Sequence, residues 1–69
     1  MKLTVSRAAA LMGKSPMFVR IGLQRKLLDI GVAYKVTGKK WSYSISPGKL
    51  ADWLGIPVDD LEKRVEALN

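Results

Sequence analysis

The chain has 69 residues, a length that allows one domain with a small hydrophobic core. It contains neither Cys nor His, which excludes disulfides and thiolate metal sites and removes the commonest general base, so an enzyme is the least expected class. At 48% apolar it is too hydrophobic to be disordered, yet no apolar run approaches the ~20 residues of a membrane helix. We expect a cytoplasmic protein with no cofactor, no metal, no membrane contact and no small-molecule substrate.

The net charge of +6 is divided unevenly along the chain. Residues 1–49 hold ten Lys or Arg and one acidic residue, a net charge of +9, whereas residues 50–69 carry −3. A basic body is typical of proteins that bind nucleic acid, although small basic domains are also often ribosomal or merely well solvated. The acidic end suggests a different task there.

Two short helices joined by a turn are predicted near the N-terminus. Thr4 suits the N-cap of the first helix, and Gly13 permits the turn that follows it. Ser15 and Pro16 then open a second helix, because Ser is a good N-cap acceptor and Pro has no N–H to leave unpaired. Two helices so joined form a helix-turn-helix, whose second helix can enter the major groove of DNA.

The second helix has two sides of different chemistry. At 100° per residue, Val19, Leu23 and Lys26 share the inner side, and Phe18 is also expected in the core. Arg suits guanine, Gln suits adenine, and an apolar side chain suits the methyl group of thymine. The alternative is a solvated face with Ile21 tucked against a later element. The predicted DNA-binding residues of this helix are Ser15, Pro16, Met17, Arg20, Ile21, Gln24 and Arg25.

A β-hairpin is predicted next, after Leu27, Leu28 and Ile30 have packed the chain back. Apolar and polar residues alternate with period 2 on both sides of a turn at residues 37–40. The apolar side, expected to cover the helices, comprises Tyr34, Val36, Trp41, Tyr43 and Ile45. The lysine-bearing tip can lie along phosphates or in the minor groove, although a Lys-Lys turn alone is usually just solvated. The predicted contacts of the wing and backbone are Lys14, Lys35, Thr37, Lys39 and Lys40.

Two further helices are predicted at the C-terminal end. Ser46 and Pro47 open the third helix, and Gly55 is expected as its left-handed cap. The apolar positions of the last helix are spaced like a short a/d pattern, which either lies on the domain's own core or contacts another protein. The candidate protein-contact residues are Val58, Leu61, Val65 and Leu68.

The predicted fold class is therefore α+β, mostly α. Residues 1–55 are expected to form a winged helix-turn-helix with two short helices, a β-hairpin wing and a third helix. Residues 56–69 are expected to form a C-terminal helix, which packs on the domain or mediates protein–protein contact.

Several short motifs of the chain, taken together, match the sequence pattern of a known protein family. They are Leu3-Thr4-Val5, Ala8-Ala9 through Gly13 and Ser15, Val19-Arg20, the hairpin aromatics Trp41 and Tyr43, and the run from Lys49 to Leu54. On these residues, the chain resembles the excisionase-type branch of the MerR-like winged helix-turn-helix superfamily over roughly residues 3–55. An aromatic residue often follows the Val-Arg pair in that branch, whereas this chain has Ile21 and Gly22.

The resemblance implies a protein of a phage or mobile element that binds double-stranded DNA in the bacterial nucleoid. Such proteins often bind cooperatively, with further copies of themselves, and bend DNA so that an integrase or other recombinase favours excision. The implied role is an excisionase, or recombination directionality factor. The alternatives are a phage transcriptional regulator, a DNA-recognition module of a packaging or replication complex, and, outside nucleic acid, a plain protein-interaction domain.

Overall fold

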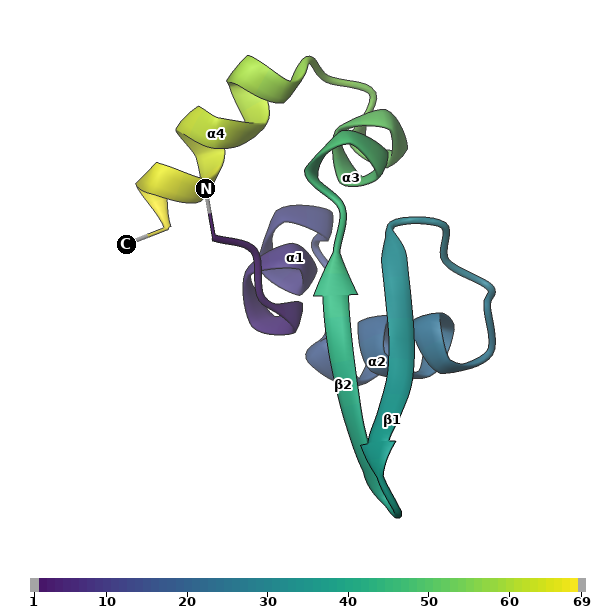
Figure 1. The fold of residues 1–69 in the computed structure, drawn as a ribbon. Helices are drawn as coiled ribbons and strands as arrows, with labels where there is room; N and C mark the ends of the chain where they lie inside the picture. Colours follow the sequence, from purple (N-terminus) through teal and green to yellow (C-terminus); the bar gives the residue numbers. More distant parts are fainter. Residues whose placement is uncertain (1, 69) are drawn as a thin grey trace.

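The computed structural model describes residues 2–68 and contains four helices and one two-stranded antiparallel sheet (Figure 1). In chain order these are α1 (Val5–Met12), α2 (Pro16–Gln24), β1 (Gly31–Thr37), β2 (Lys40–Ile45), α3 (Pro47–Leu54) and α4 (Val58–Ala67). The predicted α+β class and order of elements are confirmed. No helix among residues 2–68 combines the length and the apolar character that a bilayer span requires.

Side-chain caps begin the first three helices where the sequence predicts them. The hydroxyl of Thr4 accepts the N–H of Arg7 at 3.1 Å at the start of α1. The hydroxyl of Ser15 accepts the N–H of Phe18 at 3.2 Å at the start of α2. The hydroxyl of Ser46 accepts the N–H of Lys49 at the start of α3. Pro16 and Pro47 follow the two serines and occupy the first position of their helices. These caps satisfy backbone donors that have no partner within the helix.

The core lies where α1 meets the other helices. Figure 1 shows α1 in the middle of the molecule, between α2 and α4, and it also contacts β2. Its two alanines, Ala8 and Ala9, are fully buried, and their small side chains let the neighbouring elements approach closely. The buried apolar residues are Ala8, Ala9, Met12, Val19, Leu23, Ile30, Leu50, Ala51, Leu61 and Val65.

The hairpin faces the helices with a different set of residues from the predicted one. Tyr43 and Ile45 of β2 pack against the core together with Ala33 of β1, whereas the exposed fractions of Tyr34 and Val36 are 48% and 62%. Trp41 of β2 is also exposed and does not pack on the core. The prediction that all the apolar hairpin residues cover the helices is therefore wrong for Tyr34, Val36 and Trp41.

A β-bulge explains why Tyr34 faces away from the helices. Thr37 pairs with Lys40 beside the turn, but the register shifts between Lys35 and Thr37, so that Tyr34 pairs with Ser42. Without that shift, Tyr34 would stand opposite Tyr43 and share its face. A shift of one residue moves a whole strand's side chains to the other face of the sheet, and a bulge is the usual way to insert it.

Two glycines, Gly22 and Gly31, allow the chain around the connection between α2 and β1 to pack closely. A Cβ atom on Gly22 would lie 2.5 Å from Cδ1 of Leu28, so this glycine in the last turn of α2 makes room for the leucine. A Cβ atom on Gly31 would overlap the carbonyl oxygen of Ser44 on the partner strand. Ile30 is fully buried as predicted, but Leu27 is 75% exposed, so the expectation that Leu27 packs inward is wrong.

Candidate nucleic-acid interface

One side of α2 is free of the rest of the domain and carries most of the predicted base-contacting residues. Val19 and Leu23 are buried against the core, as predicted. Arg20 and Gln24 are half-buried, and Lys26 is exposed rather than on the inner side. The exposed members of the predicted set are Ser15, Pro16, Met17, Ile21 and Arg25. The structure thus brings this set together on one helix.

The amide of Gln24 is already engaged inside the protein. Its Nε2 donates a hydrogen bond of 2.7 Å to the hydroxyl of Tyr43 on β2. Tyr43 packs against the core, so its hydroxyl holds the Gln24 side chain in a defined position between α2 and the hairpin. Gln24 therefore keeps its carbonyl oxygen and its second N–H for another partner.

An apolar hollow lies on the outer side of α2. It is lined by Ser15, Met17, Phe18, Ile21, Gly22, Leu27 and Leu28. Phe18 is 43% exposed, so the expectation that it belongs to the core is wrong, and the ammonium of Lys14 lies 5.3 Å from its ring centroid. Contiguous exposed apolar surface of this kind marks a contact with another molecule more often than isolated apolar residues do.

The hairpin tip carries cations on an exposed turn. Gly38 has a φ of 53°, which lies in the left-handed region and permits the tight reversal. Thr37, Lys39 and Lys40 around it are exposed. Lys35, further up β1, lies with its ammonium 5.1 Å from the ring centroid of Trp41, which keeps that cation close to the strand.

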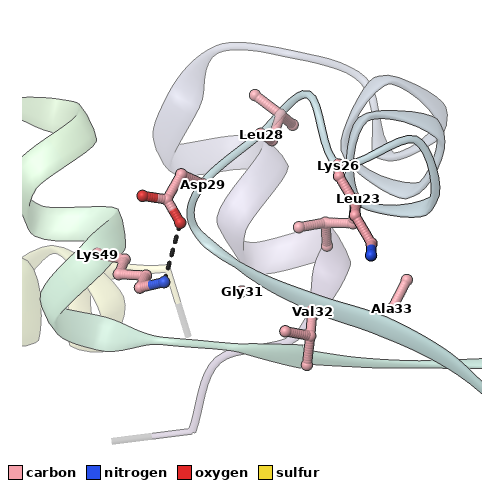
Figure 2. Close-up of a pocket in the computed structure, with 8 residues that line it drawn as sticks. All are labelled: Leu23, Lys26, Leu28, Asp29, Gly31, Val32, Ala33 and Lys49. Carbon is pink, nitrogen blue, oxygen red and sulfur yellow. Dashed lines mark hydrogen bonds and ion pairs between the residues drawn. The ribbon is translucent and has the colours of Figure 1, made fainter.

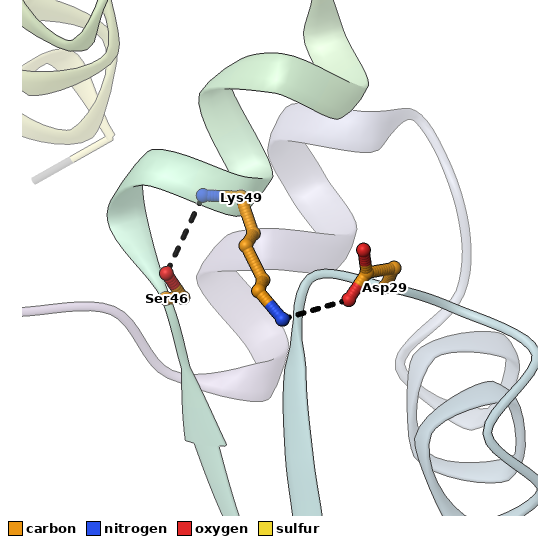
Figure 3. A network of polar contacts seen from close by, with 3 residues as sticks. All are labelled: Asp29, Ser46 and Lys49. Atoms are coloured by element: carbon orange, nitrogen blue, oxygen red, sulfur yellow. Dashed lines mark hydrogen bonds and ion pairs between the residues drawn. The ribbon is translucent and has the colours of Figure 1, made fainter.

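The single acidic residue of the first 49 positions is neutralised locally. Asp29 accepts a hydrogen bond of 2.9 Å from the ammonium of Lys49, whose backbone N–H also contacts the hydroxyl of Ser46 (Figure 3). The pair is exposed and contributes little stability. From the turn before α2 to the hairpin tip, the cations that make no ion pair with a described residue are Lys14, Arg20, Arg25, Lys26, Lys35, Lys39 and Lys40. The charged side chains of α2 and of the hairpin are therefore all positive.

A second hollow lies between the end of α2 and β1 (Figure 2). Its lining residues are Leu23, Lys26, Leu28, Asp29, Gly31, Val32, Ala33 and Lys49. Figure 2 shows Lys26 on one wall and the Asp29–Lys49 pair on the other. In the described part of the chain, no group of acidic residues is arranged to hold a metal ion.

The last helix divides its apolar residues between the core and solvent. Leu61 is fully buried and Val65 is 4% exposed, and α4 packs on α3 and α1. Val58 and Leu68, near its two ends, are 42% and 43% exposed. Two of the four predicted protein-contact residues thus lie inside the domain, and the other two are on its surface.

No protein-family model matches this chain, and no curated protein or solved structure matches it significantly. The chemistry of the surface itself is therefore what points to a partner. Three of its residues, Phe18, Lys26 and Leu27, were not among the predicted site residues. The exposure of Lys26 and Leu27 follows from where α2 ends and from the path of the next segment, neither of which the apolar periodicity defines.

Proposed function

We propose that the protein is a sequence-specific double-stranded DNA-binding protein with a winged helix-turn-helix fold. In this proposal α1 and α2 form the helix-turn-helix, α2 enters the major groove, and the β1–β2 hairpin is the wing that contacts the adjacent backbone. The observation that carries it is the positive surface of α2 and the hairpin, where cations without ion pairs surround a helix face that is free of the core.

The hairpin tip and α2 carry side chains that suit different contacts with DNA. Lys39 and Lys40 are exposed point charges on a turn, which is what a contact with phosphates requires. Arg20 on α2 offers a guanidinium that can bind O6 and N7 of guanine together. Met17 and Ile21, exposed next to it, can contact the 5-methyl group of thymine.

The salt dependence of binding tests the DNA-binding proposal. The probes are a duplex selected from a random library and an unrelated duplex of the same length, followed by fluorescence anisotropy. If about five cations meet phosphates, log K should fall against log salt with a slope near −4 to −5. A slope near zero on both duplexes would contradict DNA binding and favour a protein-interaction domain.

A charge-matched pair of variants then locates the contact. Replacing Lys39 and Lys40 by Gln should weaken binding to both duplexes alike and reduce the slope by about 2. Replacing Lys63 and Arg64 on α4 by Gln removes the same charge at the other end of the chain, and it should leave the slope unchanged. Equal losses in both double variants would show that overall charge, and not the hairpin tip, attracts the DNA.

For the biological role, we propose an excisionase that acts with an integrase and binds DNA cooperatively. The resemblance of residues 3–55 supports this role. The test adds the protein to an integrase reaction and measures excision against integration, beside gel shifts on DNA with one or several sites. Promoter repression without any effect on recombination would instead indicate a regulator. Binding only within a packaging or replication complex would indicate a module of that machine.

A further inference from the structure

Three helices of this protein end in the same hydrogen-bonded turn. After α1 the residue in the turn is Gly13, with φ 70°, and after α3 it is Gly55, with φ 72°. After α2 the residue at the equivalent place is Lys26, with φ 58°. Lys26 is the one non-glycine residue in the left-handed region among the described residues.

The hydrogen bonds show that the turn after α2 is complete. The N–H of Lys26 donates to the carbonyl of Leu23 at 3.2 Å, and the N–H of Leu27 donates to the carbonyl of Gly22 at 2.8 Å. These are the two bonds of a Schellman motif, in which glycine is strongly preferred because a Cβ atom is disfavoured at positive φ. The lysine therefore makes this helix end less stable than a glycine would.

The side chain of Lys26 makes no polar contact that would compensate for this. It is exposed and makes no hydrogen bond or ion pair with any described residue. The nearest acidic group in the hollow of Figure 2, Asp29, is bonded to Lys49 instead. A cation near a helix C-terminus gains a little from the helix dipole, but exposed Arg25 already supplies one.

The position of Lys26 continues the row of lysines on the hairpin. Lys26 and Ala33 line the same hollow, and Lys35 lies two residues further along the same face of β1. Two residues of a strand span roughly 6.6 Å. The cations therefore follow β1 from the end of α2 to the lysines at the hairpin tip, and the one acidic residue near them, Asp29, is paired with Lys49.

We infer that Lys26 binds a phosphate of the DNA backbone, and that its cation is retained there at the expense of stability. The inference rests on the proposed function, because it extends the same DNA-binding surface beyond α2 and the hairpin tip. A backbone contact of this kind adds affinity for every sequence and carries no base specificity.

Three variants at this position test the inference. Lys26→Gly removes the charge and the strain, Lys26→Asn removes the charge but still tolerates the left-handed region, and Lys26→Arg keeps both charge and strain. Thermal unfolding and the salt-dependent titrations on the selected and unrelated duplexes are measured for each. We expect Lys26→Gly to unfold about 4 °C or more above the wild-type protein.

The same variants should bind DNA less well. Lys26→Gly and Lys26→Asn should each reduce the slope of log K against log salt by about 1, with a loss of up to about tenfold at 0.1 M salt on both duplexes. Lys26→Arg should keep the wild-type slope and midpoint of unfolding.

Two results would overturn the inference while leaving the proposed function intact. One is a wild-type slope near −4 that Lys26→Gly leaves unchanged, which would mean that no phosphate lies at this position. The other is a lower midpoint of unfolding for Lys26→Gly, since the lysine would then be explained by stability alone. A flat salt dependence of the wild-type protein would overturn both the inference and the proposed function.

Discussion

The amide nitrogen of Gln24 donates a hydrogen bond of 2.7 Å to the hydroxyl of Tyr43, which joins α2 to the middle of β2. Removing that hydroxyl in Tyr43→Phe should lower the free energy of unfolding by about 1 kcal/mol, because one half-buried hydrogen bond is lost. It should also release Gln24, so that base preference at one position of the DNA site relaxes. Urea unfolding and binding to a panel of single-base variants of the selected duplex measure both effects.

Tyr34→Phe is the matched control for that prediction. Tyr34 is 48% exposed on the outer face of the hairpin and makes no hydrogen bond with another described residue through its side chain. Removing the hydroxyl of Tyr34 should change neither the free energy of unfolding nor the base preference in DNA binding. Equal effects of the two substitutions would remove the role assigned to the bond between Gln24 and Tyr43.

The same substitution should have opposite effects at two glycines. Gly31→Ala should lower the free energy of unfolding by about 3 kcal/mol, since the new Cβ atom meets the backbone of β2 at Ser44. Gly48→Ala, in α3, meets no atom within 4 Å and should raise it by about 0.5 kcal/mol. Thermal unfolding of both variants tests the pair, and a stable Gly31→Ala protein would show that the strands can move apart.

The last helix should prove necessary for the fold. Leu61→Ala should lower the free energy of unfolding by about 2–5 kcal/mol, because Leu61 is completely buried. Leu68→Ala, at a residue 43% exposed, should cost less than about 1 kcal/mol. A protein truncated after Gly55 should lose its cooperative unfolding transition. Retention of that transition would indicate that α4 is an accessory contact and not part of the core.

Arg20 should read the DNA sequence through its guanidinium. Arg20→Lys keeps the charge but loses the two-pronged donor, so it should lose about 1–3 kcal/mol of specific binding while keeping the salt dependence. Competition titrations of the selected duplex against the unrelated one measure this discrimination. A uniform loss on both duplexes would place Arg20 at a phosphate instead of a base.

The apolar side of α2 should contact thymine methyl groups. Each methyl that Met17 or Ile21 covers contributes roughly 0.8 kcal/mol, so deoxyuridine in place of that thymidine should weaken binding about fourfold. Ile21→Ala should then bind the thymidine and deoxyuridine duplexes alike if Ile21 makes the contact. Wild-type binding that ignores the substitution at every thymidine would assign the apolar hollow to another partner.

Much of the fold was predictable because its signals are local. Thr4, Ser15 and Ser46 mark helix starts through hydrogen bonds that span only three residues. Gly13 and Gly55 mark helix ends through their own backbone conformation. The alternation of apolar residues on each side of Gly38 likewise indicates two strands. None of these signals depends on what the distant parts of the chain do.

Local sequence patterns were thus enough to predict the number, type and order of the elements, and composition was enough to show the excess of positive charge in residues 1–49. The tertiary structure alone decided which residues those elements present. A one-residue bulge before Thr37 turned Tyr34 outward, Tyr43 engaged Gln24, and the turn after α2 exposed Lys26. The reason is that strand register, side-chain pairing and the path of a connecting segment depend on contacts between residues far apart in the chain, which periodicity and capping rules do not contain.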